Sequence, residues 1–251
     1  MKEQDFFRHV AGRLGRFEPL QAAPSRTVIG APEFWQEYEL DVRDRAEKFR
    51  NELEKLGGHV TVYPTLEELQ QGLAGLLQEL SPTEVGTWGE SFLEEFGLST
   101  VLESYSAVKW DPQNGSDLSG SDLSSSALRG SDLTERMAAV DVGITGCDYA
   151  VADTGSLVLL ASVEQGRSVS LLPSIHIVLV KQSQIKTRIG EVLADIAQHY
   201  PNQGDATKQP SSINFITGPS RSSDIENDLS IGVHGPAAVF SLVLLDEENH
   251  A

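Results

Sequence analysis

The sequence has 251 residues and is strongly acidic, because 37 Asp and Glu outnumber 19 Lys and Arg and leave a formal net charge of −18. This length suffices for one sizeable core with a small appendage. The charge disfavours nucleic acids and anionic membranes as partners, since both carry the same sign. The single cysteine, Cys147, excludes an internal disulfide and an iron–sulfur cluster held by cysteines of this chain alone.

No targeting or membrane-spanning segment is evident. The N-terminus carries acidic residues and no long apolar run follows it, so we expect no signal peptide. A run of about eighteen apolar residues is also missing, and we therefore expect no membrane insertion. Both expectations place the protein in the cytoplasm.

The first part of the chain is predicted to alternate between helices and strands. Residues 1–33 are predicted to form an N-terminal helical arm, in which Phe6, Phe7 and Val10 share one face. Residues 34–246 are predicted to form the main domain. Its first helices are predicted at 34–56, 65–80 and 92–96, and its first strands at 59–63, near 84 and at 101–105. Such alternation is typical of a sheet covered by crossover helices.

Residues 111–130 differ in composition from the rest of the chain. The sequence Gly-Ser-Asp-Leu begins at Gly115, Gly120 and Gly130, and Ser, Gly and Asp dominate. So little apolar surface does not offset the entropy of ordering, which predicts a flexible insert. A lid over the site and a calcium-binding loop are the functional alternatives, although the spacing does not match an EF-hand.

The second half is predicted to be a compact α/β ligand-binding core from about Asp141 to Leu245. His176 interrupts an otherwise apolar strand, which suits a buried central strand with a core or site-wall histidine. After a short helix at 133–139, strands are predicted at 140–145, 157–161, 168–172, 175–180, 213–217 and 238–244, and a helix at 185–200.

The loop from Thr217 to Arg221 is the strongest candidate for a ligand site. A helical turn starting near Ser223 would bring free backbone N–H groups and Arg221 together at the end of a strand. That arrangement suits a phosphate or carboxylate at the carboxyl edge of the sheet. Capping of a helix is the structural alternative. The candidate ligand-binding residues here are Thr217, Gly218, Pro219, Ser220, Arg221 and Asp224.

Two other loops contain candidate site residues. His234 and Gly235 lie between two ordered segments, where the histidine could transfer a proton or simply complete a tight turn. The segment from Thr145 to Ser156 places polar residues where a strand ends. Its candidate ligand-binding residues are Thr145, Asp148, Thr154 and Gly155. No catalytic residue is assigned, but the candidates for such a role are His234, Asp153 and Glu226.

Several common signatures are missing from the sequence. It contains no G-x-G-x-x-G, Walker A, H-E-x-x-H or G-x-S-x-G motif, and no metal site is predicted. Cys147 is interpreted as a small buried residue. Residues 164–167 are interpreted as a hairpin turn.

Four motifs, in this order, carry a resemblance to a known family. They are G-I-T-G-C-D-Y-A-V-A-D-T-G-S-L-V-L-L from Gly143, S-L-L-P-S-I-H-I-V-L-V from Ser170, T-G-P-S-R-S-S-D-I-E from Thr217 and G-V-H-G-P from Gly232. Together they resemble the LUD domain family, and within it the lactate utilization protein C (LutC/YkgG) group. The resemblance covers about 105 residues densely, and it implies an α/β fold like that of the NagB/RpiA/CoA-transferase proteins, a sheet with helices on both faces.

The resemblance also implies a function. The family takes part in an operon-encoded system that oxidises L-lactate to pyruvate with iron–sulfur partner proteins. With one cysteine, this chain would be an accessory subunit without a cluster, binding a small anionic ligand or an unidentified cofactor. The alternatives are an independent transferase or isomerase acting on a phosphorylated or CoA-linked substrate, and a regulatory or docking module without chemistry. A homo-oligomer is left open.

Overall fold

The computed structural model of the chain describes residues 3–18, 38–111, 130–200, 209–223 and 229–246. By internal packing the chain divides into residues 1–38 and residues 39–251. The first unit contains α1 (Glu3–Arg13), which leaves the side chains of Phe6, Phe7 and Val10 exposed. The helical character of the arm is thus confirmed, while its predicted boundary at residue 33 stays a prediction.

A parallel sheet of six strands forms the centre of the second unit. Most of its strands are apolar and buried on both faces, as is usual in parallel sheets. In spatial order the strands are β1 (His59–Tyr63), β12 (Ala238–Leu244), β7 (Ile175–Lys181), β4 (Val142–Gly146), β2 (Glu84–Thr87) and β3 (Ser106–Lys109).

The chain leaves the neighbouring strands β2 and β4 in opposite directions. After β2 it passes through α4 (Glu90–Phe96) and α5 (Ser99–Leu102) to β3 on one side, whereas after β4 it continues to β7 on the other. Open α/β sheets bind ligands outside the carboxyl ends of their strands, at such a change of direction. The strand order therefore places the expected ligand crevice outside β2 and β4.

Helices cover both faces of the parallel sheet, as predicted. Gly143 and Gly146 are three residues apart in β4 and so face opposite sides. A side chain at Gly143 would meet Val169 of α7 (Ser168–Leu171), whereas one at Gly146 would meet Phe92 of α4. The remaining helices next to this sheet are α2 (Val42–Lys55), α3 (Leu66–Leu80) and α6 (Gly130–Ala139).

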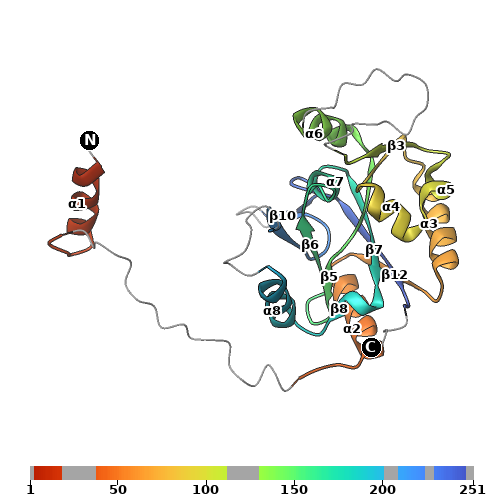
Figure 1. The fold of residues 1–251 in the computed structure, drawn as a ribbon, viewed down its shortest axis with the longest axis horizontal. Helices are drawn as coiled ribbons and strands as arrows, with labels where there is room; N and C mark the ends of the chain where they lie inside the picture. The colour runs from red at the N-terminus through yellow and green to blue at the C-terminus, as the bar shows by residue number, and fades with distance from the viewer. Residues whose placement is uncertain (1–2, 19–37, 112–129, 201–208, 224–228, 247–251) are drawn as a thin grey trace. The chain divides into compact units, whose positions relative to one another are not determined.

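A second, mixed sheet packs against one face of the parallel sheet. Its strands, in spatial order, are β8 (Ile185–Lys186), β5 (Tyr149–Val151), β6 (Ser156–Ala161) and β9 (Ser212–Ile216). One face joins the main core, and the other packs on α8 (Ile189–His199) through Val158, Leu160 and Val192. Figure 1 shows the resulting order of layers, from α8 through the mixed and parallel sheets to α3, α4 and α5.

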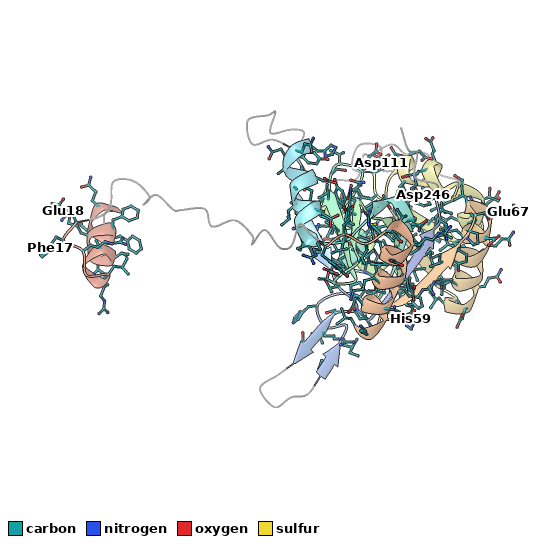
Figure 2. The ribbon with its side chains drawn as sticks, turned by 90° about the horizontal axis from the view of Figure 1, so that it is seen from below. Phe17, Glu18, His59, Glu67, Asp111 and Asp246 are labelled. Carbon is teal, nitrogen blue, oxygen red and sulfur yellow. The ribbon has the colours of Figure 1, made fainter. Side chains whose placement is uncertain are left out.

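A small antiparallel ribbon completes the architecture. It consists of β10 (Arg221–Ser223) and β11 (Leu229–Ile231), and it stands out from the body of the second unit (Figure 2). In the described part of the chain, no helix is long and apolar enough to cross a membrane.

The helix starts follow from local capping. The side chain of Thr65 accepts a hydrogen bond from the Glu68 backbone N–H at 3.2 Å, so α3 starts at Leu66. The Asp41 side chain does the same for the Asp44 N–H at 2.9 Å. The helix predicted at 34–56 therefore begins only at Val42, after this cap.

Three other predictions are corrected by the structure. The strands predicted at 101–105 and 168–172 are wrong, because these residues lie largely in the helices α5 and α7 and in loops. Short apolar runs do not distinguish helix from strand by periodicity. The helix predicted at 185–200 begins with β8 instead, and α8 starts after Arg188, whose N–H donates to Glu191 Oε1 at 3.1 Å.

The predicted insert falls mostly outside the described residues. Its part from 112 to 129 is not described. The helix predicted at 133–139 starts earlier, at Gly130.

Candidate functional site

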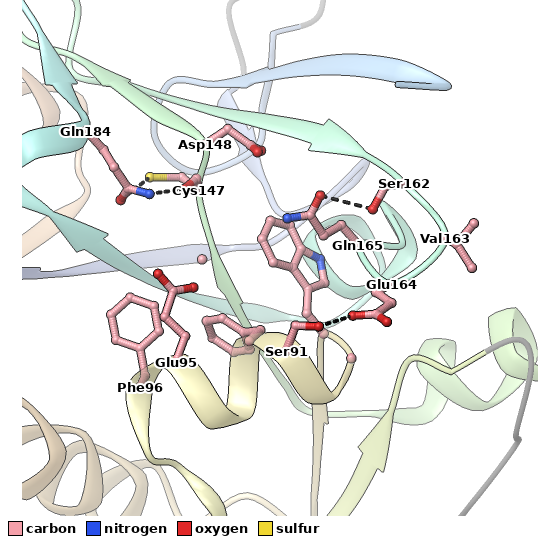
Figure 3. Close-up of a pocket in the computed structure, with 14 residues that line it drawn as sticks. Ser91, Glu95, Phe96, Cys147, Asp148, Ser162, Val163, Glu164, Gln165 and Gln184 are labelled. Atoms are coloured by element: carbon pink, nitrogen blue, oxygen red, sulfur yellow. Dashed lines mark hydrogen bonds between the residues drawn. The ribbon is translucent and has the colours of Figure 1, made fainter. Parts of the chain in front are cut away.

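A cavity of about 560 Å³ lies outside the carboxyl ends of β2 and β4, at the expected crevice. Its walls come from elements far apart in the sequence. They include Trp88 after β2, Ser91, Phe92 and Glu95 of α4, Cys147 and Asp148 after β4, residues 162–165 after β6, and Gln184 of the 3₁₀ turn η2 (Gln182–Gln184). We call this cavity the switch-point pocket; Figure 3 shows Glu95 rising from α4 into it.

The carboxyl group of Asp148 lines this pocket and is largely buried. Its Oδ2 accepts a hydrogen bond from the Leu160 backbone N–H at 2.7 Å. Burial raises the pKa of its carboxyl group from 3.8 to about 6, and the negative charge of Glu95 contributes in the same direction. Near neutral pH such a carboxyl group can accept or donate a proton, which is typical of functional sites.

Gln184 holds the loop that carries Asp148. Its Nε2 donates to the Cys147 carbonyl at 2.7 Å, while its Oε1 accepts from the Lys181 N–H at 2.8 Å. The thiol of Cys147 is buried, and burial raises its pKa, so the sulfur is a neutral, structural group. The interpretation of Cys147 as a small buried residue is confirmed.

The remaining pocket groups are mostly acidic and aromatic. Glu95 pairs with Lys181 at 2.5 Å, and Glu164 accepts from the Ser91 hydroxyl at 2.5 Å. The indole Nε1 of Trp88 is buried and has no hydrogen-bond partner. Lys181 compensates the charge of Glu95, but Asp148 and Glu164 disfavour a small anion. The pocket therefore suits an organic ligand that brings N–H or O–H donors and a flat apolar surface.

Five of the predicted ligand-binding residues lie elsewhere, around the C-terminal turn of α2. Ser156 Oγ lies 2.8 Å from both Thr154 Oγ1 and Thr217 Oγ1. Gly155 has a φ of +60°, and a Cβ there would overlap the Leu53 backbone. Because α2 ends just before β1, this region lies at the amino end of that strand. We call its predicted residues the amino-edge cluster; they are Thr154, Gly155, Thr217, Gly218 and Arg221.

Arg221 and Gly218 both contact the last residue of that turn. The Arg221 guanidinium donates a hydrogen bond to the Leu56 carbonyl, which is one of the acceptors left open at the end of α2. Gly218 has a φ of +88° and packs its backbone against the same residue. Both residues thus have a structural contact, and their role toward a ligand stays a prediction.

The structure describes a strand, not a helical turn, up to Ser223. Residues from Arg221 to Ser223 form β10, which pairs with β11 so that Arg221 faces Ile231. Within the residues that the structure describes, no helix start therefore gathers free N–H groups beside Arg221. The predicted place at the carboxyl edge is also wrong, because the loop after β9 meets the parallel sheet at its amino edge. Asp224 and Glu226 lie outside the described residues.

The loops around Ser220 and His234 do lie side by side. The Ser220 N–H donates to the Pro236 carbonyl at 2.8 Å, and the Gly232 N–H donates to the Ser220 carbonyl at 2.9 Å. His234 and Gly235 line a separate cavity of about 400 Å³ with residues that precede β7. Pro219 is half-buried between these contacts. None of these residues lines the switch-point pocket.

The other predicted residues are held by structural partners. Asp153 forms an ion pair with Arg188 at 3.3 Å. Thr145 is fully buried, and its hydroxyl lies 2.8 Å from Nε2 of His176. Burial lowers the pKa of His176 from 6.5 to about 3, so the ring is neutral. The interpretation of His176 as a core histidine is confirmed.

Sequence reasoning missed Trp88, Glu95 and Gln184. Trp88 directly follows β2, so the rule that strand ends face a cleft could have found it. Glu95 and Gln184 gave no such signal, because one lies on a helix and the other in a turn. In the described residues no group of His, Cys, Asp and Glu is arranged to hold a metal ion.

The LUD domain family matches residues 46–244 of this chain. Lactate utilization protein C of Halalkalibacterium halodurans is 31% identical over 248 residues, which cover 98% of each chain. The uncharacterized protein YkgG of Escherichia coli K12 is 32% identical, over 68% of this chain and 67% of its own. The chain belongs to the LUD domain family.

A solved structure is also similar to the chain. It is the crystal structure of a DUF162 family protein from Deinococcus radiodurans, with 17% sequence identity and a TM-score of 0.49, covering 82% of this chain and 99% of that one.

Proposed function

We propose that this chain takes part in lactate utilisation, as a subunit without a cluster in an iron–sulfur-dependent system that oxidises L-lactate to pyruvate in the cytoplasm. The name of the H. halodurans relative, which matches along 98% of its length, supports the pathway. The single cysteine supports a role without a cluster, because iron–sulfur clusters would have to be held by other subunits.

The observation that carries a ligand role is the desolvated Asp148 at the switch-point pocket. Its raised pKa and its fixed hydrogen bond from Leu160 provide a proton-transfer group beside an aromatic wall. In the proposed role this pocket binds an organic ligand of the lactate system, and Asp148 exchanges a hydrogen bond or a proton with it.

Gene deletion with complementation tests the proposal. Deletion is expected to abolish growth on L-lactate and to leave growth on glucose unchanged. Wild type should restore growth and Asp148→Asn should not, whereas Asp44→Asn is a matched control at an exposed position on α2. Undiminished growth of the deletion strain, in a background without another lactate dehydrogenase, would refute the proposal.

The docking module without chemistry is the second candidate. The contacts at the amino edge favour it, because the motif residues Thr217 and Arg221 form hydrogen bonds within the chain. Restored growth with Asp148→Asn, together with co-purification of an iron–sulfur protein, would select this role. The transferase or isomerase alternative loses its main support, since Arg221 does not lie at a helix start.

A further inference from the structure

A second hollow lies at the carboxyl edge of the parallel sheet, over β1 and β12. It is an open groove of about 1020 Å³ between α2 and the residues that follow β1, β12 and β7. Figure 1 shows α2 beside the end of β12, and Figure 2 labels Asp246, which follows that strand. Gln182 lines this groove while Gln184 lines the switch-point pocket, so the turn η2 separates the two hollows.

Two arginines of α2, Arg43 and Arg50, line the groove. Arg43 and Arg50 are seven residues apart and therefore project from the same face of the helix, about 10 Å apart along its axis. In the described part of the chain neither forms a salt bridge, although acids outnumber bases nearly twofold in the sequence. Arg50 is only half-exposed, and its Nε is buried without a hydrogen-bond partner.

An unsatisfied, desolvated guanidinium N–H is costly to the protein alone. The cost is removed when an oxyanion accepts the hydrogen bond, and guanidinium groups bind carboxylates and phosphates with two parallel bonds. The acids of the groove offer no such acceptor to Arg50. Asp246 already accepts hydrogen bonds from the backbone N–H and the hydroxyl of Ser183, and Glu47 is exposed on α2.

We propose that this groove binds an anionic organic ligand through Arg43 and Arg50, with carboxylate or phosphate groups as the recognised chemistry. The spacing of the two arginines fits a ligand with more than one oxyanion group. Glu47 lies between them in sequence and limits the affinity by repulsion. The site is separate from the switch-point pocket and does not depend on the role proposed for it.

Calorimetric titration of the full chain at low salt tests the site with four probes. Citrate represents polycarboxylates, tripolyphosphate represents phosphate chains, and L-lactate and pyruvate represent monocarboxylates. We expect citrate or tripolyphosphate to bind, and whichever binds more tightly identifies the oxyanion. Arg43→Gln and Arg50→Gln should each weaken that binding by roughly tenfold, and Glu47→Gln should strengthen it by about threefold.

Arg167→Gln is the matched control, because it removes one exposed positive charge outside the groove. It should leave the affinity within about twofold of wild type. Without ligand, Arg50→Gln should not lower the Tm, since the removed Nε has no partner to lose. If Arg50→Gln fails to fold, the variants Arg43→Gln and Glu47→Gln, at exposed positions, still test the proposal. No binding of any probe at ~10 mM, or equal affinities of wild type, Arg43→Gln and Glu47→Gln, would overturn the proposal.

Discussion

The two edges of the parallel sheet use their polar residues differently. At the carboxyl edge, Asp148 is desolvated beside a cavity and Trp88 has an unpartnered N–H. At the amino edge, Thr217 and Arg221 are engaged by the Ser156 hydroxyl and by the end of α2. Thr217 and Arg221 thus have structural partners, while the cavity combines the predicted Asp148 with residues that were not predicted, such as Trp88 and Glu95.

This difference shows why motif density alone is a weak guide to a binding site. Glycines and hydroxyl groups are needed wherever a backbone passes close to a helix end, and ligand loops need the same residues. A polar group available to a ligand is distinguished by a missing partner or by desolvation, which the sequence does not show. Four predictions test the distinction.

The largest expected effect concerns acid stability. Because the folded pKa of His176 is about 3 and its ordinary value is 6.5, the unfolded chain binds more protons between these values. The free energy of unfolding should therefore fall by on the order of 4 kcal/mol as the pH drops from 6.5 toward 3. When the free energy of unfolding is measured with urea at several pH values in this range, it should fall less steeply with decreasing pH for His176→Gln than for wild type. Equal slopes would show that the buried histidine is not a neutral structural group.

The next effect tests whether the amino-edge cluster serves the fold. Gly155→Ala combines a left-handed φ of +60° with an overlap on the Leu53 backbone, and it should lower the free energy of unfolding by about 3 kcal/mol. Gly75→Ala is the control, because this exposed position on α3 has open space and should gain up to about 1 kcal/mol. A stable Gly155→Ala protein with impaired growth on L-lactate would instead assign the cluster a functional role.

A pH effect of opposite sign is expected at the carboxyl edge. The folded pKa of Asp148 is raised from 3.8 to about 6, so the folded chain binds more protons between these values and loses stability as the pH rises through them. At pH 7 Asp148→Asn should be more stable than wild type by about 1–2 kcal/mol, and the difference should vanish below pH 4. Thermal unfolding at both values measures it. A variant that is less stable at pH 7 would contradict the desolvated acid.

The smallest effect separates a structural role of Arg221 from a ligand-binding role. Loss of its hydrogen bond to the Leu56 carbonyl should lower the free energy of unfolding by about 1 kcal/mol in Arg221→Ala. The affinity for citrate or tripolyphosphate should stay unchanged, because this side chain does not line the arginine-containing groove. A lost affinity with unchanged stability would restore the ligand role that the sequence suggests.

Much of the architecture was accessible from the sequence. The apolar run around Ile177 predicts a buried central strand, and the alternation of elements predicts a sheet with helices on both faces; the structure confirms both. Local patterns suffice for such features because burial on both faces demands continuous apolar residues. They did not suffice for the short helix at Ser168–Leu171, since four residues show no period.

The candidate site was accessible only in part. Asp148 was predicted from its position after a strand, and it does line the pocket. Residues 221–223 form a strand that pairs with 229–231, a contact that no local pattern specifies. Glu95 and Gln184 reach the pocket from other elements and were not found.

The sequence by itself determined the α/β class, the family and the strongly acidic charge balance. These properties follow from composition, periodicity and motif order, which need no knowledge of distant contacts. Only the tertiary structure decided which edge of the sheet each polar residue occupies. It also decided which polar groups keep a free hydrogen-bonding position, because desolvation and partnership depend on residues brought together from separate elements.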